Sequence, residues 1–286
     1  MTATPKADGL TIRRMSGDEV GLIRTWAEAE RWNPGTHDGP AFYAADPGGF
    51  FLGERGGEPV ACVSCVRYGE RYGFLGQYIV RPDCRGLGYG LAIWRAGMTH
   101  LAGRAVGLDG VLAQVPNYER SGFRFAHHTA RYAGTGGGAR PDGLVPLGGV
   151  PFDTVAAYDT GCFPAPRTAF LRAWLALPES VALAATRHGR LTGYGVLRRS
   201  ADGHKVGPLF ADDLDTAARL LAGLTAAAPG RPFCVDVPDD TVQPAGEHLV
   251  RAFGLTEVFR TARMYTAEPP AHDAARVFGV TSLELG

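Results

Sequence analysis

The chain has 286 residues, a length that predicts two domains of ordinary size. Hydrophobic residues make up 45% of it and charged residues 20%, a globular composition that excludes wholesale disorder. Basic and acidic residues both number 29, and a chain of zero net charge is a poor candidate for a protein that binds nucleic acid or an anionic membrane.

The cysteines and the hydropathy predict a soluble protein with reduced thiols. The five cysteines are odd in number and irregularly spaced, unlike a disulfide framework. The first ten residues lack the basic-then-apolar pattern of a secretory signal, and no stretch reaches the roughly 20 apolar residues of a membrane helix. We therefore expect a cytoplasmic protein without a membrane partner.

The first half of the chain predicts strands and helices in alternation. Asp18 is a suitable cap for a helix with apolar residues on one face, and a Gly56-Gly57 turn joins two strands into a hairpin. We expect strands at Thr11–Met15, Phe50–Glu54, Pro59–Arg67, Tyr72–Val80, Val111–Val115 and Phe123–Tyr132, helices at about Asp18–Glu30, from the glycine-rich segment at 85–90 to about Leu101 and near Asn117–Ser121, and a loop region at Trp32–Pro47.

Glycine and proline concentrate in the middle of the chain. Residues 133–150 contain seven of the 40 glycines and two prolines, a composition that predicts a linker without regular structure. We expect one domain over residues 1–133, a linker over 134–150 and a second domain over 151–286.

The second half repeats the order of the first with little sequence identity, which predicts an internal structural repeat. We expect strands at Val181–Thr186, Leu191–Arg199, His204–Phe210, Phe233–Val237 and Glu257–Tyr265, and helices at Leu214–Ala226 and Ala245–Phe253.

The segment Arg85-Gly86-Leu87-Gly88-Tyr89-Gly90 lies between a predicted strand and a predicted helix. Glycines there let backbone N–H groups at a helix N-terminus approach a diphosphate without a side chain in the way. Two common phosphate loops are excluded, because Gly-x-Gly-x-x-Gly fails at Leu91 and the P-loop lysine is missing. The spacing alone leaves a plain glycine-rich turn open.

Two motifs in this order resemble the GNAT acetyltransferase superfamily. The segment from Val80 to Gly90 resembles its acetyl-CoA pyrophosphate loop, Gln/Arg-x-x-Gly-x-Gly/Ala, and Asn117-Tyr118-Glu119-Arg120-Ser121-Gly122-Phe123 resembles its Asn…Tyr-Glu-Lys-x-Gly-Phe stretch. Tandem GNAT proteins of the YitH type are similar around Trp32–Gly35, Asp38, Asp46-Pro47, Gly207–Phe210 and Arg263–Tyr265. The resemblance covers essentially the whole chain. It implies an α+β fold of two GNAT-like domains in tandem, each a mostly antiparallel mixed sheet flanked by helices.

The resemblance also implies an N-acetyltransferase that passes the acetyl group of acetyl-CoA directly to a primary amine, without a metal. A main-chain N–H of the strand before the loop would polarise the thioester carbonyl, and Tyr118 would protonate the leaving thiolate. Asn117 and the loop would help to hold the cofactor. The implied cofactor-binding residues are Tyr78, Ile79, Val80, Arg85, Gly86, Leu87, Gly88, Tyr89, Gly90 and Asn117.

The acceptor site and the general base are less defined. Trp32, Asn33 and Asp38 occupy loops through which GNAT folds admit the acceptor, so the resemblance implies that they face the substrate. Carboxylates that could take the proton of the amine are Glu28, Glu30, Asp38 and Glu119, and no spacing selects among them. The acceptor stays open between a small-molecule amine and a peptide or protein lysine, and homodimer formation stays open as well.

The second half departs from the family at Ala211-Asp212-Asp213-Leu214-Asp215, which stands where its glycine-rich loop would be. Three carboxylates there would cap the helix that follows and repel a phosphate. We predict that the second, GNAT-like domain does not bind acetyl-CoA. The alternative to an enzyme is a non-catalytic acyl-CoA-binding sensor or scaffold protein.

Two further patterns do not predict a metal site. Cys62 and Cys65 lie three apart on an alternating strand and point to opposite faces, and so do the adjacent His127 and His128. We expect core cysteines and no bound metal.

Overall fold

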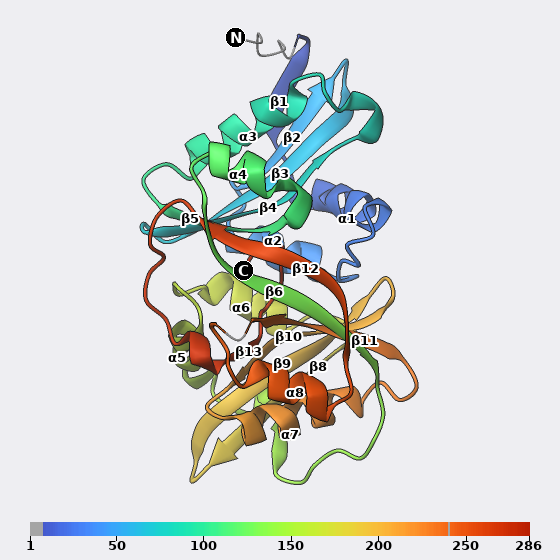
Figure 1. Cartoon of the computed structure of the whole chain (residues 1–286), viewed down its shortest axis with the longest axis vertical. Helices are drawn as coiled ribbons and strands as arrows, with labels where there is room; N and C mark the ends of the chain where they lie inside the picture. The colour runs from blue at the N-terminus through green and yellow to red at the C-terminus, as the bar shows by residue number, and fades with distance from the viewer. Residues whose placement is uncertain (1–7, 240) are drawn as a thin grey trace.

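The computed structural model describes residues 8–239 and 241–286, and its two halves repeat one order of elements (Figure 1). Each half runs strand, two helices, three strands, helix, strand, helix, strand, so the predicted internal repeat is confirmed. The first half comprises β1 (Leu10–Arg14), α1 (Val20–Ala29), α2 (Asp38–Ala45), β2 (Phe50–Arg55), β3 (Glu58–Tyr68), β4 (Tyr72–Val80), α3 (Tyr89–His100), β5 (Ala105–Val111), α4 (Val115–Arg120) and β6 (Arg124–Thr135). The second half comprises β7 (Leu144–Pro146), α5 (Phe152–Cys162), α6 (Thr168–Leu175), β8 (Ser180–Arg187), β9 (Arg190–Ser200), β10 (Gly203–Ala211), α7 (Leu214–Thr225), β11 (Pro232–Pro238), α8 (Gly246–Ala252) and β12 (Thr256–Tyr265), followed by β13 (Val277–Gly279).

The last strands of the two halves are exchanged. The sheet order is β1-β2-β3-β4-β5-β12-β6-β11-β10-β9-β8-β7, so β12 pairs with β5 of the first half and β6 pairs with β11 of the second. The two exchanged strands pair with each other, and Figure 1 shows them side by side across the junction of the halves. Among the described residues, only β4 with β5 and β10 with β11 pair in parallel, which confirms the expected mixed, mostly antiparallel sheet.

A repeated ion pair marks the exchange. Both exchanged strands carry Thr-Ala-Arg, at 129–131 and at 261–263. Arg131 on β6 donates to Asp236 on β11 at 2.7 and 2.9 Å, and Arg263 on β12 donates to Asp109 on β5 at 2.9 and 2.6 Å. All four side chains are buried. Because a buried charge is tolerated only beside its partner, these pairs hold each exchanged strand in register.

The helices pack on both faces of the sheet. The pairs α1 with α2 and α5 with α6 meet between the halves, where Phe42 stacks on Trp174 with ring centroids 5.8 Å apart. The opposite face of the first half packs against α3 and α4, and that of the second against α7 and α8. One shared apolar core therefore joins the two halves into one body.

Three expectations about local structure are wrong. The strand predicted at Val111–Val115 is instead β5, at Ala105–Val111, and residues 112–120 are helical. The prediction missed β5 because Gly107 and Gly110 interrupt its apolar pattern. The expected loop region Trp32–Pro47 contains α2. The glycine-rich stretch 134–150 holds the end of β6 and the short β7, so it does contain regular structure. The hairpin around Gly56-Gly57 is confirmed.

Candidate active site

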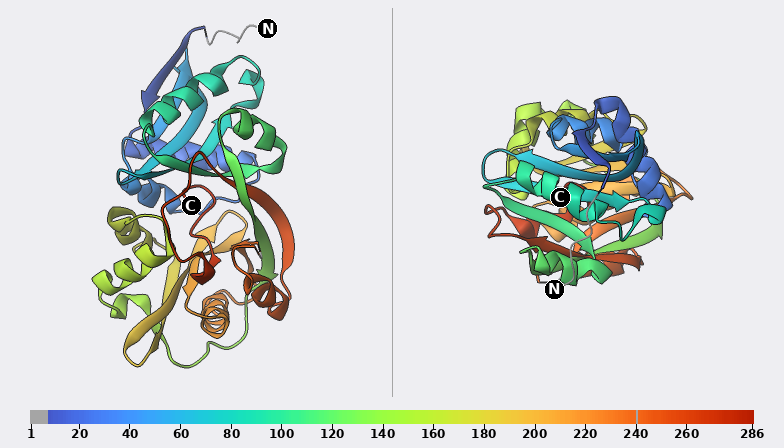
Figure 2. Two further views of the ribbon diagram at one scale, coloured as in Figure 1. Left: turned by 60° about the vertical axis from the view of Figure 1, so that its left-hand side comes forward. Right: turned by 90° about the horizontal axis from the view of Figure 1, so that it is seen from above.

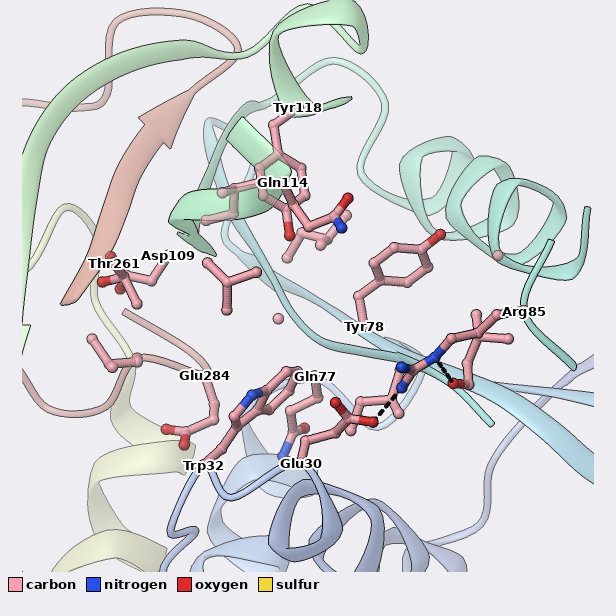
Figure 3. A pocket seen from close by; sticks show the side chains of 18 of the residues that line it. Glu30, Trp32, Gln77, Tyr78, Arg85, Asp109, Gln114, Tyr118, Thr261 and Glu284 are labelled. Atoms are coloured by element: carbon pink, nitrogen blue, oxygen red, sulfur yellow. Dashed lines mark hydrogen bonds and ion pairs between the residues drawn. The ribbon is translucent and has the colours of Figure 1, made fainter. Parts of the chain in front are cut away.

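An opening between β4 and β5 positions the candidate site. The two strands pair only over Tyr72–Phe74 and Ala105–Gly107. Beyond Phe74, within the described residues, β4 pairs only with β3, and its register shifts around Gln77, whose φ is 49°. The free edge of β4 therefore presents unpaired backbone groups to a pocket of about 560 Å³ (Figure 3).

The glycine-rich loop forms one end of this pocket. Gly86 and Gly88 have φ of 80° and 85°, a conformation that other residues rarely adopt, and Gly88 precedes the first turn of α3. A Cβ at Gly90 would overlap the hydroxyl of Tyr78. Because the first N–H groups of a helix have no acceptor within it, the loop and the start of α3 are suited to bind an anion.

Arg85 links the loop to the end of α1. Its Nε donates to the Val80 carbonyl at 3.0 Å, and its guanidinium hydrogen-bonds the carboxylate of Glu30 (Figure 3). The two side chains are 52% and 28% exposed. Exposed ion pairs contribute little free energy, so a ligand phosphate can compete with Glu30 for Arg85.

Tyr118 on α4 reaches the pocket across β5. Its ring stacks on Trp94 of α3 at 5.8 Å between centroids, and it lies so close to Gly110 that a Cβ there would overlap it. Burial, with a smaller contribution from Tyr78, raises the pKa of Tyr118 to about 12. A protonated phenol therefore lines the pocket.

The exchanged strands line the other end of the pocket. Arg131 comes from β6, and Phe259 and Thr261 come from β12. Arg131 donates to the carbonyl of Trp32 at 2.8 Å and so fixes the backbone of that pocket residue. The second half therefore supplies part of the wall of a pocket built on the first.

Glu284 also lines the pocket, from a segment that runs between the halves near the label C in Figure 2. Its carboxylate lies 3.6 Å from the ammonium of Lys205 on β10, and both side chains are buried. Burial opposes the charge of Glu284, but Lys205, Arg131 and Arg198 outweigh this effect and lower the pKa of the carboxyl below its usual value. Sequence reasoning missed this residue because no motif surrounds it.

Most of the predicted site residues meet in this pocket. Among the predicted cofactor residues, Leu87 and Tyr89 do not line the pocket, because the side chain of Leu87 points to solvent and that of Tyr89 is buried against Val60 and Cys84. Asn117 stays outside the pocket, where its amide hydrogen-bonds Gln114 and Arg120. The predicted residues that line the pocket are Trp32, Tyr78, Ile79, Val80, Arg85, Gly86, Gly88, Gly90 and Tyr118.

Asn33 and Asp38 do not line the pocket and instead join the two halves. The buried carboxylate of Asp38 accepts from Nε of Arg198 at 2.9 and 3.1 Å, because a carboxylate in this core needs a cation beside it. Asn33 accepts from the backbone N–H of Asp202 at 2.9 Å. This placement corrects the expectation that both residues face the substrate.

The four carboxylates proposed as general bases are also separated by the structure. Glu28 pairs with Arg24 on α1 at 2.5 Å, and Glu119 is exposed outside the pocket. Asp38 is held by Arg198, as described above. Of these four, Glu30 alone lines the pocket.

The equivalent opening in the second half is filled by the chain itself. β10 pairs with β11 only over His204–Val206, and further along its partner is β13, at Leu209 and Phe210. Asp213 caps α7 by accepting from the N–H of Thr216 at 2.8 Å, as expected for a carboxylate at that turn. The second half thus lacks both the open edge and the glycine-rich loop of the first.

Within 8–239 and 241–286, no group of three or more histidine, cysteine or acidic side chains is arranged to hold a metal ion. No helix in that part of the chain is long and apolar enough to cross a membrane. The five cysteines are buried free thiols, and burial raises the pKa of Cys62 to about 12.

Both halves match known sequence families. Residues 20–123 match the profile of the acetyltransferase (GNAT) family, and residues 155–279 match that of an acetyltransferase (GNAT) domain. A holothin acyltransferase from Pseudoalteromonas sp. is 34% identical over 286 aligned residues, which cover 96% of this chain and 94% of that protein. The uncharacterised N-acetyltransferase YitH of Bacillus subtilis is 25% identical over 191 residues, 64% of this chain and 66% of its own.

Solved structures share the fold. A Pyrococcus horikoshii protein provisionally described as an acetyltransferase superposes with a TM-score of 0.83 at 20% identity, covering 98% of this chain and 96% of that one. A tandem GNAT protein from the clavulanic acid biosynthesis pathway gives 0.59 at 14% identity, over 91% and 99% of the two chains. The two family matches and the full-length relative show that this chain belongs to the GNAT acetyltransferase family, with two GNAT domains in tandem.

Proposed function

We propose that the protein is an N-acyltransferase that transfers the acetyl group of acetyl-CoA to a primary amine. One observation carries the proposal: the free edge of β4, the loop at 85–90 and the phenol of Tyr118 converge on a single pocket. The reaction needs a binding site for the thioester, a binding site for the diphosphate and a proton donor for the leaving group, and these three parts match those needs in that order.

The donor fits the first half. An extended pantetheine arm pairs with the free edge of β4 at Tyr78–Val80 as an added strand would. The diphosphate takes the N–H groups of residues 85–90 and draws the guanidinium of Arg85 away from Glu30. The conformations of Gly86 and Gly88 keep side chains out of this cradle.

The reaction requires one bond to form and one to break. The amine nitrogen attacks the thioester carbonyl carbon, the C–N bond forms and the C–S bond breaks. A backbone N–H of the β4 edge stabilises the negative oxygen of the intermediate. The surplus proton of the nitrogen passes to a carboxylate of the pocket, and Tyr118 gives its phenolic proton to the thiolate. Burial that keeps the phenol protonated also makes the departing thiolate more basic.

The acceptor enters from the end lined by the exchanged strands. Trp32, Phe259 and Thr261 enclose that end, which favours a small-molecule amine over a lysine on a folded protein. The full-length relative is named for acylation of holothin, so holothin is the first acceptor to test.

The test measures free CoA released from acetyl-CoA and from longer acyl-CoAs, with holothin, amines, amino acids and peptides as acceptors. Gly88→Glu should abolish acyl-CoA binding in isothermal titration, because it places a carboxylate where the diphosphate binds. Gly57→Glu is the matched control, because Gly57 has the same φ of 85° in an exposed turn away from the pocket. Equal affinity of both variants for acyl-CoA would refute the site.

The second candidate is a non-catalytic acyl-CoA-binding sensor or scaffold, since the same donor seat needs no acceptor. Tight acyl-CoA binding without CoA release across the whole acceptor panel would favour it over the enzyme.

A further inference from the structure

The carboxylates that line the pocket differ in how fully they are paired. Asp109 receives two hydrogen bonds from Arg263, at 2.9 and 2.6 Å, and Glu30 is held by Arg85. Glu284 lies 3.6 Å from Lys205, and within the described residues its Oε2 has no hydrogen-bond partner. A buried carboxylate oxygen without a donor costs free energy, which an incoming N–H group would recover.

The segment that carries Glu284 is firmly seated. The hydroxyl of Tyr68 donates to the carbonyl of Leu285 at 3.1 Å, and the guanidinium of Arg167 donates to the hydroxyl of Thr281 at 2.8 Å. Gly76 on β4 lies so close that a Cβ there would overlap the carbonyl oxygen of Glu284. The glutamate is therefore held against the strand whose free edge faces the pocket, rather than carried on a loose end.

Glu284 and Tyr118 come from different sides of the pocket. Figure 3 shows Glu284, Trp32 and Gln77 gathered at one end, and Tyr118 and Gln114 at the other. An acid that protonates the leaving thiolate and a base that serves the incoming nitrogen need such a separation, because the two groups stand on opposite sides of the reacting carbon. The amide oxygen of Gln77, at the same end, is also buried without a partner among the described residues.

We propose that Glu284 binds the amino group of the acceptor and is the general base of the transfer, an inference that rests on the proposed function. The carboxylate accepts a hydrogen bond from the amine. As the C–N bond forms and the C–S bond breaks, it takes the proton that the nitrogen gives up, while the proton of Tyr118 goes to the thiolate. When the products leave, Glu284 releases its proton to solvent and the phenolate of Tyr118 takes up a proton from solvent, which restores both groups.

The surrounding charges suit this role. Lys205, one of the two lysines in the chain, faces Glu284 from β10 and keeps it ionised, hence ready to accept a proton. The attacking nitrogen becomes strongly acidic once it bonds to the carbonyl carbon, so an ionised carboxylate is a sufficient base. Glu30 is the rival candidate, because a diphosphate that takes Arg85 leaves it unpaired, and the experiment includes it.

The experiment compares Glu284→Ala and Glu284→Gln with the unchanged full-length protein, with Glu30→Gln, and with Glu119→Gln as a matched control outside the pocket. Initial rates of CoA release are measured with the best acceptor of the panel, and acyl-CoA affinity is measured by titration. Exogenous formate, a carboxylate small enough for the space left by alanine, is then added to each variant.

Both Glu284 variants should bind acyl-CoA within about threefold of the unchanged protein, yet their kcat/KM for the amine should fall about 100-fold. Formate should raise the kcat/KM of Glu284→Ala at least about tenfold. It should not change the kcat/KM of Glu284→Gln, because the glutamine side chain fills the space. The Glu119→Gln protein should keep most of its activity, and the loss of kcat/KM in Glu30→Gln should be smaller than that in Glu284→Gln.

Four results would overturn the proposal. Normal turnover in both Glu284 variants excludes the residue as base, and loss of acyl-CoA binding together with turnover assigns it a structural role. A loss in Glu30→Gln as large as that in Glu284→Gln assigns the base to Glu30. No amine-dependent CoA release by the unchanged protein refutes the proposed function itself, which separates that failure from the others.

Discussion

Gly110→Ala tests whether the position of Tyr118 controls the rate. Gly110 lies on β5 directly beneath the ring of Tyr118 and has an ordinary strand conformation, so alanine introduces no backbone strain. The new Cβ would stand 2.7 Å from Cδ2 of Tyr118 and closer still to Cε2. Since carbon atoms pack at about 3.5–4.0 Å, the ring must move by about 1 Å.

The expected loss follows from that displacement. A reacting group misplaced by about 1 Å costs on the order of 100-fold in rate, so kcat for acyl transfer should fall by about that factor. Acyl-CoA affinity should change little, because the loop at 85–90 is untouched. Gly53→Ala on β2 is the control, since its nearest neighbour is the side chain of Leu10 at 3.3 Å, away from the pocket.

A double-mutant cycle separates this explanation from a general disturbance of β5. Tyr118→Phe removes the acid and should by itself lower kcat about 100-fold or more. If Gly110→Ala acts through Tyr118, adding it to Tyr118→Phe should cost less than about a further threefold. A full additional loss in the double variant, or normal kcat in Gly110→Ala alone, would refute the reasoning.

Three further predictions follow from the structure. Isothermal titration should give one acyl-CoA per chain, because β13 fills the opening of the second half, and a stoichiometry of two would contradict this. The pH profile of kcat/KM should show no loss from Tyr118 between about pH 8 and about pH 10, because burial raises its pKa to about 12 and the required protonated form persists; a fall centred near pH 10 would contradict it. Arg263→Met leaves Asp109 buried and unpaired and should cost about 3–5 kcal/mol in urea unfolding. Arg260→Met breaks only the exposed pair with Glu257 on the same strand and should cost less than about 1 kcal/mol, so equal costs would argue against the role of burial.

The residues of the proposed donor side could be identified from the sequence because they lie in local motifs. Arg85 to Gly90 and Tyr118 each lie in a short motif. The chemistry of the first motif depends on the start of α3, and that of Tyr118 depends on α4. The proposed acceptor side depends on segments far apart in the chain. Trp32, Arg131 and Glu284 come together only in the folded chain, so their spacing along the sequence could not predict a shared pocket.

Asp38 shows why a residue near an expected site can be misassigned. Its position beside the acceptor loops suggested a substrate contact, yet the cation that decides its role is Arg198, 160 positions away. Burial of both side chains turns the pair into a contact between the halves. A sequence displays the carboxylate, whereas its partner and its exposure are products of packing.

The exchange of strands was hidden for a different reason. The Thr-Ala-Arg repeat marks β6 and β12 as equivalent, and Asp109 and Asp236 mark β5 and β11 as equivalent. Each arginine would find the same carboxylate in its own half or in the other, so the two arrangements offer the same pairing chemistry. The sequence identifies the partners by type and leaves the choice between them to the rest of the fold.

The segment after β12 fills the opening of the second half and then contributes a residue to the pocket of the first half. After β12, β13 occupies the opening between β10 and β11, where a second donor would lie. The same segment then continues between the halves, where Val280 donates to the carbonyl of Asp236 at 2.9 Å, and ends beside β4 with Glu284 lining the first pocket. With β12 and Lys205, which faces Glu284, the second half contributes wall, charge and a carboxylate to the site of the first. In the proposed function, the second GNAT domain, whose own opening is filled by β13, therefore serves as the acceptor side of the first.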